Sequence, residues 1–149
     1  MLLPDEAATF DFGKQLAARL FPGAVIALDG PLGAGKTRLV QGIAAGVGID
    51  PATVTSPTFT LVQEYPLPPD QQAARGIGKI FHLDAYRVNS PEEFWELGIE
   101  EMFASSNWTI IEWASRVRMC LPREYLGVEI LHCGKNERKV ISTNGWIIF

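Results

Sequence analysis

Residues 30–37 constrain this chain more than any other feature, because they fit the pattern G-x-x-x-x-G-K-[ST]. An apolar, β-prone run at 24–28 precedes the motif, and residues 36–47 have a helical pattern that Gly48 closes. The glycines let the backbone turn tightly and aim successive N–H groups at an anion, and the helix dipole adds roughly half a positive charge there. A chance glycine-rich turn would need neither the strand nor the helix. The motif therefore predicts a phosphate-binding loop.

The side chains of the motif indicate a magnesium-nucleotide site. Lys36 is expected to bridge the β- and γ-phosphates, and the Thr37 hydroxyl is expected to bind Mg²⁺, which prefers hard oxygen ligands. The predicted nucleotide contacts of the loop and the first helical turn are Gly33, Ala34, Gly35, Lys36, Thr37 and Arg38. The chain contains no Asn-Lys-x-Asp guanine-reading motif, which favours ATP over GTP.

Helical and strand patterns alternate along the chain. Strands are expected at 24–28, 59–65, 79–83 and 108–111, and helices at 5–21, 36–47, 91–103 (short pieces broken at Gly98) and 114–120. The inner face of the first helix, capped by Asp5, is expected to comprise Thr9, Phe12, Leu16 and Leu20. The alternating runs 125–132 and 138–143 predict an antiparallel hairpin at the sheet's edge.

These patterns predict an α/β fold of the P-loop NTPase-like, three-layer kind, with a mainly parallel sheet and antiparallel additions that include the C-terminal hairpin. The 149 residues are enough for such a core, and 47% of them are hydrophobic. We therefore expect residues 1–149 to form a single domain.

Two carboxylates directly follow predicted strands, Asp84 and Glu112. Ligands of parallel α/β sheets bind beyond the carboxyl ends of the strands, so both side chains are expected at the phosphate site. One would bind the metal directly or through water, and the other would orient the attacking water or take its proton. The residues alone leave that assignment open, and a carboxylate that only caps the next turn is the alternative for each. His82 is expected to be a hydrogen-bonded packing residue.

Three other segments have more than one interpretation. Residues 55–58 (TSPT) follow the P-loop helix, where a switch segment would sense the γ-phosphate, but a plain Ser-Pro turn fits equally well. Trp113 would wall off water, offer a partner surface, or pack in the core. Residues 67–78 are polar and contain proline and glycine, which predicts an exposed, mobile connection.

Composition narrows the class of protein further. The formal net charge is −4 and the Lys and Arg residues are scattered, which is unfavourable for gripping nucleic acid alone. No apolar run reaches membrane-spanning length and the first residues lack a leader pattern, so a cytoplasmic location is expected. Cys120 and Cys133 have no CxxC spacing and are expected to be buried thiols rather than zinc ligands.

The motifs occur together in an order that resembles the TsaE (YjeE) family, whose members are bacterial P-loop ATPases needed to make threonylcarbamoyladenosine in tRNA. The segments that carry the resemblance are 5–9 (DEAAT), 32–37 (LGAGKT), 56–62 (SPTFTLV), 82–87 (HLDAYR), 91–93 (PEE) and 111–113 (IEW). They span nearly the whole chain, and the combination is far more specific than the P-loop alone.

The resemblance implies site roles that the residues alone leave open. It implies that Thr37 and Glu112 hold Mg²⁺ and that Asp84 is the Walker-B-like acidic residue, with Lys36 and Asp84 serving hydrolysis. It implies that Thr9 and Arg138 contact the nucleotide and that residues 56–60 are the switch segment. It also implies slow ATP hydrolysis by the protein alone and action with the partner proteins TsaB and TsaD, so that tRNA is met only through that complex.

Two other functions remain alternatives. A small P-loop kinase would need an acceptor pocket and arginine-rich lid elements, for which Arg75 and Arg87 are candidates. A nucleotide-gated binding module would hydrolyse ATP only incidentally.

Overall fold

Parallel pairing of four apolar strands forms the centre of the fold. The structure, a computed structural model, describes residues 1–57 and 61–144, and in this part of the chain one sheet has seven strands in the order β1-β7-β6-β2-β5-β4-β3. The strands are β1 (Leu2–Leu3), β2 (Val25–Asp29), β3 (Val62–Pro66), β4 (Lys79–Asp84), β5 (Trp108–Glu112), β6 (Leu126–His132) and β7 (Arg138–Asn144). Strands β6, β2, β5 and β4 run parallel, whereas β1, β7 and β3 are paired antiparallel. The expected mainly parallel sheet with antiparallel additions is confirmed.

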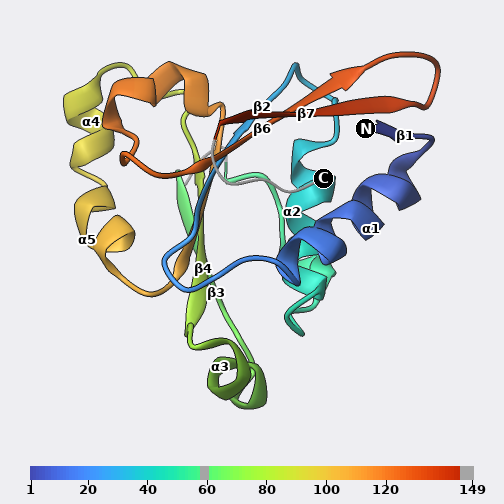
Figure 1. Ribbon diagram of the computed structural model, residues 1–149. Helices are drawn as coiled ribbons and strands as arrows, with labels where there is room; N and C mark the ends of the chain where they lie inside the picture. The colour runs from blue at the N-terminus through green and yellow to red at the C-terminus, as the bar shows by residue number, and fades with distance from the viewer. Residues whose placement is uncertain (58–60, 145–149) are drawn as a thin grey trace.

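Helices cover both faces of the sheet, which confirms the three-layer architecture (Figure 1). They are α1 (Glu6–Ala17), α2 (Lys36–Ala45), η1 (Pro51–Thr53), α3 (Pro69–Arg75), α4 (Pro91–Trp95), α5 (Ile99–Ala104) and η2 (Ala114–Cys120). Helices α1 and α2 lie on one face, and α4, α5 and η2 lie on the other. Alternate residues of the central strands point to the two faces, so Ile26 joins one apolar cluster and Val25 the other. No helix in the two described stretches combines the length and apolar character that a membrane crossing requires.

Helix α1 packs closely against α2 and so supports the helix that begins at the P-loop. Its predicted inner face is confirmed, because Thr9, Phe12, Leu16 and Leu20 are all buried. The two backbones meet at glycines: a Cβ at Gly42 would lie 2.1 Å from the carbonyl oxygen of Phe10. That approach leaves no space for a side chain.

Several predicted boundaries are wrong in detail. Helix α1 ends at Ala17 rather than at residue 21, and two tighter i→i+3 turns carry the chain on to Leu20. The short strand β1 was not predicted. The strand predicted at 59–65 is observed over Val62–Pro66, while residues 58–60 lie outside the described part of the chain. The helix predicted at 114–120 is a 3₁₀ segment with a kink at Val117.

The prediction of an exposed connection at residues 67–78 is right in that helix α3 has no buried residue, but the segment is helical and its ends are anchored. Leu67 and Ile77 on either side of the helix are each only 2% exposed. Arg75 donates hydrogen bonds to the carbonyl oxygens of Ala17 (3.0 Å) and Gly46 (3.4 Å), at the ends of α1 and α2. A proline in the first turn and a glycine after the last are compatible with a short helix as well as with a loop.

Replacing Gly42 with alanine tests the close contact between α1 and α2. Alanine favours helix formation over glycine by roughly 1 kcal/mol, so without a clash Gly42→Ala would stabilise the protein. Because the added Cβ meets backbone, we instead expect Gly42→Ala to destabilise it by about 1–3 kcal/mol in urea unfolding. The control is Gly78→Ala, where the Cβ makes an ordinary 3.5 Å contact with Asn107. A Gly42→Ala protein as stable as the control would contradict the observed packing.

Candidate nucleotide-binding site

The turn between β2 and α2 has the backbone conformation that the glycine-rich motif requires. Gly35 precedes α2 with φ of 107°, and Gly30 follows β2 with φ of 149°. A Cβ at Gly30 would lie 2.3 Å from the carbonyl oxygen of Ile130 on the neighbouring strand β6. The loop therefore lies tightly against the end of the sheet, directly before the amino end of α2, where unpaired N–H groups favour an anion.

Lys36 lies folded back onto its own loop. Its Nζ donates hydrogen bonds to the carbonyl oxygens of Gly30 and Pro31, the latter at 3.0 Å, and lies 4.1 Å from the centre of the Trp113 ring. Burial lowers the pKa of Lys36 below its ordinary value, while the negative charges of nearby carboxylates act in the opposite direction. An incoming phosphate would compete with the loop carbonyls for this ammonium group.

Asp84 and Glu112 lie side by side at the carboxyl ends of β4 and β5. They are register partners in the parallel pair and are only 4% and 2% exposed. Asp84 Oδ2 accepts a hydrogen bond from the Ser56 hydroxyl (3.2 Å), and its Oδ1 accepts one from the Tyr86 backbone N–H (2.8 Å). The expectation that the two carboxylates meet at one edge of the sheet is confirmed, and Asp84 also caps the next turn.

Glu112 faces the first turn of α2. Its Oε1 and Oε2 lie 3.5 and 3.4 Å from the Thr37 hydroxyl oxygen. Adjacent oxygen ligands of an octahedral Mg²⁺ lie roughly 3 Å apart, so this hydroxyl and this carboxylate are suitably spaced for one ion. Among the described residues, no cluster of three or more His, Cys, Asp or Glu side chains could hold a metal. Thr37 and Glu112 could therefore supply oxygen ligands to one Mg²⁺ ion on the strength of their spacing.

The other hydrogen bonds of Glu112 come from a buried polar network. Nε2 of His82 lies 2.6 Å from Glu112 Oε2, and Nδ1 of the same ring lies 3.0 Å from the Tyr65 hydroxyl oxygen. His82 has no exposed surface, which confirms that it is a hydrogen-bonded packing residue. Burial raises the pKa of Tyr65 to about 12, and the Glu112 charge acts in the same direction. Tyr65 therefore keeps its proton at neutral pH.

Aromatic side chains form one wall of the site. The rings of Trp113 and Tyr86 pack with their centres 4.8 Å apart, and Arg116 lies 5.7 Å from the Tyr86 ring centre. Trp113 has φ of 59°, a left-handed conformation that is uncommon for a bulky residue and is concentrated at functional sites. Trp113 packs against the apolar cluster on the α4 and η2 side of the sheet and is partly exposed beside Lys36, so it lies at the border between that core and the site.

Two buried side chains, Arg138 and Thr9, lie against the P-loop at Ala34 and Gly35. Arg138 Nε donates a 2.8 Å hydrogen bond to the carbonyl oxygen of Ala34, and its Nε would lie 3.7 Å from a Cβ at Gly35. The Thr9 methyl group approaches the same position to 3.6 Å, while its hydroxyl donates to the carbonyl oxygen of Asp5 (3.3 Å). Both residues therefore lie beside the loop, with their observed bonds to protein backbone.

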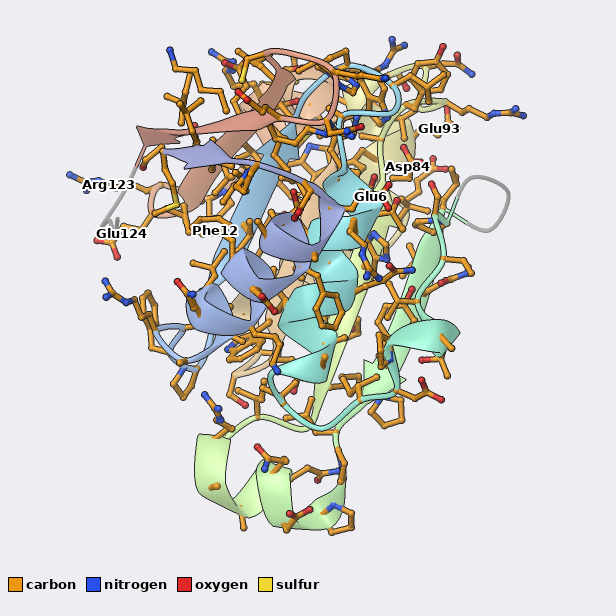
Figure 2. All side chains as sticks on the ribbon, turned by 90° about the vertical axis from the view of Figure 1, so that its right-hand side faces the viewer. Glu6, Phe12, Asp84, Glu93, Arg123 and Glu124 are labelled. Carbon is orange, nitrogen blue, oxygen red and sulfur yellow. The ribbon has the colours of Figure 1, made fainter. Side chains whose placement is uncertain are left out.

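A cavity of about 430 Å³ opens in front of these elements. It is lined by Glu6, Leu32, Gly33, Gly35, Lys36, Thr37, Arg38, Ser56, Asp84, Tyr86, Arg87, Glu112 and Trp113. Figure 2 shows Glu6, at the start of α1, and Asp84 on the same side of the molecule, near the start of α2. The volume is sufficient for a small ligand, and the lining includes both cations and carboxylates.

Residues 3–140 match the sequence model of a family described as "Threonylcarbamoyl adenosine biosynthesis protein TsaE". The chain belongs to the TsaE family. The resemblance carried by the six sequence segments is thus confirmed.

Individual relatives agree with the family match over most of the chain. A protein of Bacillus subtilis (strain 168), named tRNA threonylcarbamoyladenosine biosynthesis protein TsaE, is 37% identical over 140 residues, which cover 94% of this chain and 80% of the relative. A protein of the same name from Synechocystis sp. (strain ATCC 27184 / PCC 6803 / Kazusa) is 41% identical over 127 residues, or 77% of this chain and 69% of the relative. The crystal structure of Bacillus subtilis YdiB superposes with a TM-score of 0.71 at 30% identity, and the match covers 94% of this chain and 80% of that one.

Within this TsaE-family fold, most residues predicted for the site line the cavity: Gly33, Gly35, Lys36, Thr37, Arg38, Asp84 and Glu112. The predicted contacts Thr9, Ala34 and Arg138 are not among the lining residues, because Ala34 is a buried residue of the loop and the other two lie against the loop. Arg38 stacks on the Phe10 ring at 4.5 Å, and its Nε is buried with no hydrogen-bond partner among the described residues.

Two further expectations, on the switch segment and on the cysteines, have different outcomes. Thr55, Ser56 and Pro57 of the predicted switch segment are described, whereas its residues 58–60 lie outside the described part of the chain. The cysteine prediction is right for Cys120, which is buried, and wrong for Cys133, which is exposed near the tip of the β6–β7 hairpin. Sequence reasoning missed Tyr65, which no local motif marks, and gave no site role to Glu6, although Glu6 lies in the segment 5–9 that carries part of the resemblance.

The raised pKa of Tyr65 predicts how stability depends on alkaline pH. A tyrosine of the unfolded chain ionises near pH 10, so between pH 10 and about 12 the unfolded state loses a proton that the folded state keeps. The free energy of unfolding should therefore fall as the pH rises through this range, and Tyr65→Phe should reduce the slope in urea unfolding at pH 9–11. Tyr125→Phe, which removes a tyrosine hydroxyl near the opposite apolar cluster, is the variant for comparison. Equal slopes for the two variants would contradict the raised pKa.

Proposed function

We propose that this chain is a Mg²⁺-dependent P-loop ATPase that supports the threonylcarbamoyladenosine modification of tRNA, together with TsaB- and TsaD-like partners in the cytoplasm. One observation carries the proposal: Lys36 and Thr37 of the P-loop line the same cavity as the buried carboxylates Asp84 and Glu112. The relatives named tRNA threonylcarbamoyladenosine biosynthesis protein TsaE supply the pathway.

In this proposal, binding of ATP exchanges the partners of Lys36. The ammonium group leaves the carbonyl oxygens of Gly30 and Pro31 for the β- and γ-phosphates, while the backbone amides of residues 33–38 hold the phosphate oxygens. Arg138 keeps the loop in its shape through the carbonyl oxygen of Ala34, so its effect on the nucleotide is exerted through the loop.

Thr37 and Glu112 would hold the Mg²⁺ ion, which when bound neutralises charge on the β- and γ-phosphates. Asp84 would orient the attacking water or take its proton, since its carboxylate lines the cavity beside Glu112. Ser56 donates to Asp84, and this hydrogen bond joins the predicted switch segment to the catalytic carboxylate.

The charge of the protein supports an indirect relation to tRNA. With a formal net charge of −4, the chain is poorly suited to neutralise phosphates along a nucleic acid, so we assign tRNA binding to the partners.

If hydrolysis is part of the role, a non-hydrolysable ATP analogue will allow assembly with the partners but not repeated rounds of modification. Full repeated modification with the analogue would instead support a nucleotide-gated binding module.

The kinase alternative is weakened by the position of Arg75. A lid arginine would have to lie over the phosphates, but Arg75 donates to backbone carbonyls at the ends of α1 and α2. Only Arg87 of the two candidates lines the cavity.

Lys36→Ala tests the phosphate site directly. Removing the ammonium group takes away the positive charge at the β- and γ-phosphates, so ATP hydrolysis and support of tRNA modification in a reconstituted system should be lost. Circular dichroism and thermal melting should show an intact fold. The matched control is Lys79→Ala, which removes an exposed lysine paired with Glu64 on the sheet's far edge. Unchanged ATP turnover in Lys36→Ala would refute the assigned role.

Asp84→Asn separates a catalytic from a structural carboxylate. The substitution keeps the shape and hydrogen-bonding capacity but removes the charge, so hydrolysis should fall about 10²–10⁴-fold with a smaller effect on ATP affinity. Steady-state phosphate release and calorimetric ATP binding would measure the two effects. If Asn lowers only the melting temperature and leaves turnover unchanged, Asp84 serves only as the cap of the following turn.

A further inference from the structure

Three polar side chains form a diagonal row across strands β3, β4 and β5. Gln63 on β3 is the register partner of His82 on β4, so Tyr65, two residues on, lies diagonal to His82 on the same face. His82 is in turn the register partner of Ile110 on β5, so Glu112 is also diagonal to it. The row Tyr65–His82–Glu112 follows from this register, on the face that α1 and α2 cover.

The hydrogen-bonding groups of the row fix the orientation of its last member. An ionised carboxylate only accepts hydrogen bonds, so the 2.6 Å contact places a hydrogen on Nε2 of His82, which donates it to Glu112 Oε2. The other ring nitrogen is 3.0 Å from the Tyr65 hydroxyl, which prevents the imidazole from turning over. The Glu112 carboxylate is thereby held with both oxygens within 3.5 Å of the Thr37 hydroxyl.

The polar side chains of the row lie in a buried part of the protein, where polar groups are costly in free energy. His82 has no exposed surface and Tyr65 is 6% exposed, within a face built mainly from apolar side chains. Burying polar groups is unfavourable unless every one is hydrogen-bonded, and an apolar pair would fill the same space without that requirement. The network instead supplies a hydrogen bond to the Glu112 carboxylate and so limits its rotation.

The polar contacts continue from Tyr65 to Thr55, the first residue of the predicted switch segment. The Tyr65 hydroxyl oxygen also lies close to Gln63 Oε1 and 3.4 Å from the carbonyl oxygen of Thr55, and its single hydrogen serves one acceptor at a time. Gln63 Nε2 lies 3.4 Å from the Thr55 hydroxyl. Thr55 is the neighbour of Ser56, which donates to Asp84. Asp84 is thus bonded to this segment directly, and Glu112 is linked to it through His82 and Tyr65.

We propose that His82, held in place by Tyr65, is a positioning residue that fixes the Glu112 carboxylate toward Thr37 and thereby sets the affinity of the nucleotide site for Mg²⁺. This inference rests on the proposed function, since it concerns the metal of the same site. The hydrogen bonds to ligating carboxylates in metal sites commonly change metal affinity or activity 10- to 100-fold when they are removed.

The first experiment examines the protein without nucleotide or metal. The chain has only two histidines, so long-range ¹H–¹⁵N spectra of the imidazoles can be assigned with His132→Gln, which removes the other one. We expect a slowly exchanging, low-field Nε2–H proton for His82 that moves in Glu112→Gln. An Nε2 without a hydrogen, or a signal that Glu112→Gln leaves in place, would overturn the proposal.

The second experiment measures the contribution of Mg²⁺ to nucleotide binding. ADP affinity is determined by calorimetry with Mg²⁺ and with EDTA, for the parent and for His82→Leu, His82→Gln and Tyr65→Phe. In His82→Leu, the gain in affinity from Mg²⁺ should fall about 10- to 100-fold, with binding in EDTA unchanged. His82→Gln, which keeps a donor nitrogen, should restore part of the gain, and Tyr65→Phe should lose less than His82→Leu.

The controls separate this inference from the function on which it rests. Tyr125→Phe removes a hydroxyl near the opposite apolar cluster and should behave as the parent. If His82→Leu does not fold, the test depends on His82→Gln and Tyr65→Phe. A gain in ADP affinity from Mg²⁺ equal to the parent's in both variants would refute the positioning role. A parent protein without Mg²⁺-dependent ADP binding would refute the proposed function, whereas the spectra would still report the His82–Glu112 bond.

Discussion

The parallel register between β4 and β5 determines where the charged side chains of the site lie. Because parallel strands end at the same edge, Asp84 and Glu112 are direct neighbours, and β2 delivers the P-loop to that edge beside them. The backbone hydrogen bonds of three strands thus fix the distance between the loop and the carboxylates.

Most of the buried polar and charged side chains that the structure describes lie toward this end of the sheet. Lys36, His82, Asp84, Glu112 and Arg138 are each less than 9% exposed, in contrast to the largely apolar core beneath them. Burying charges is unfavourable unless they are paired, and each of these groups has a partner in the loop or the neighbouring strands. Leaving one of these buried charges without its partner would therefore lower stability as well as function.

Local patterns were sufficient to predict the parts of this fold that depend on neighbours in sequence. The strand, glycine-rich turn and helix around Lys36 were correct, as were the break at Gly98 and the C-terminal hairpin. The row from Tyr65 to Glu112 was not predictable, since it depends on the register of three strands that are separate in sequence. The bond from Arg138 to Ala34 joins residues 104 positions apart, and no spacing rule indicates it. Helix α3 was missed because proline and glycine are common to short helices and to loops.

The bond between Arg138 and the P-loop has a consequence for the order of folding. Strand β7, which carries Arg138, pairs with β6 and with β1, and β1 comes from the opposite end of the chain. Contacts between residues so far apart form slowly, because a long stretch of chain must first be closed into a loop. During synthesis, the glycine-rich loop would leave the ribosome some hundred residues before the arginine that braces it. Nucleotide capture would then be among the last properties that a newly made molecule acquires.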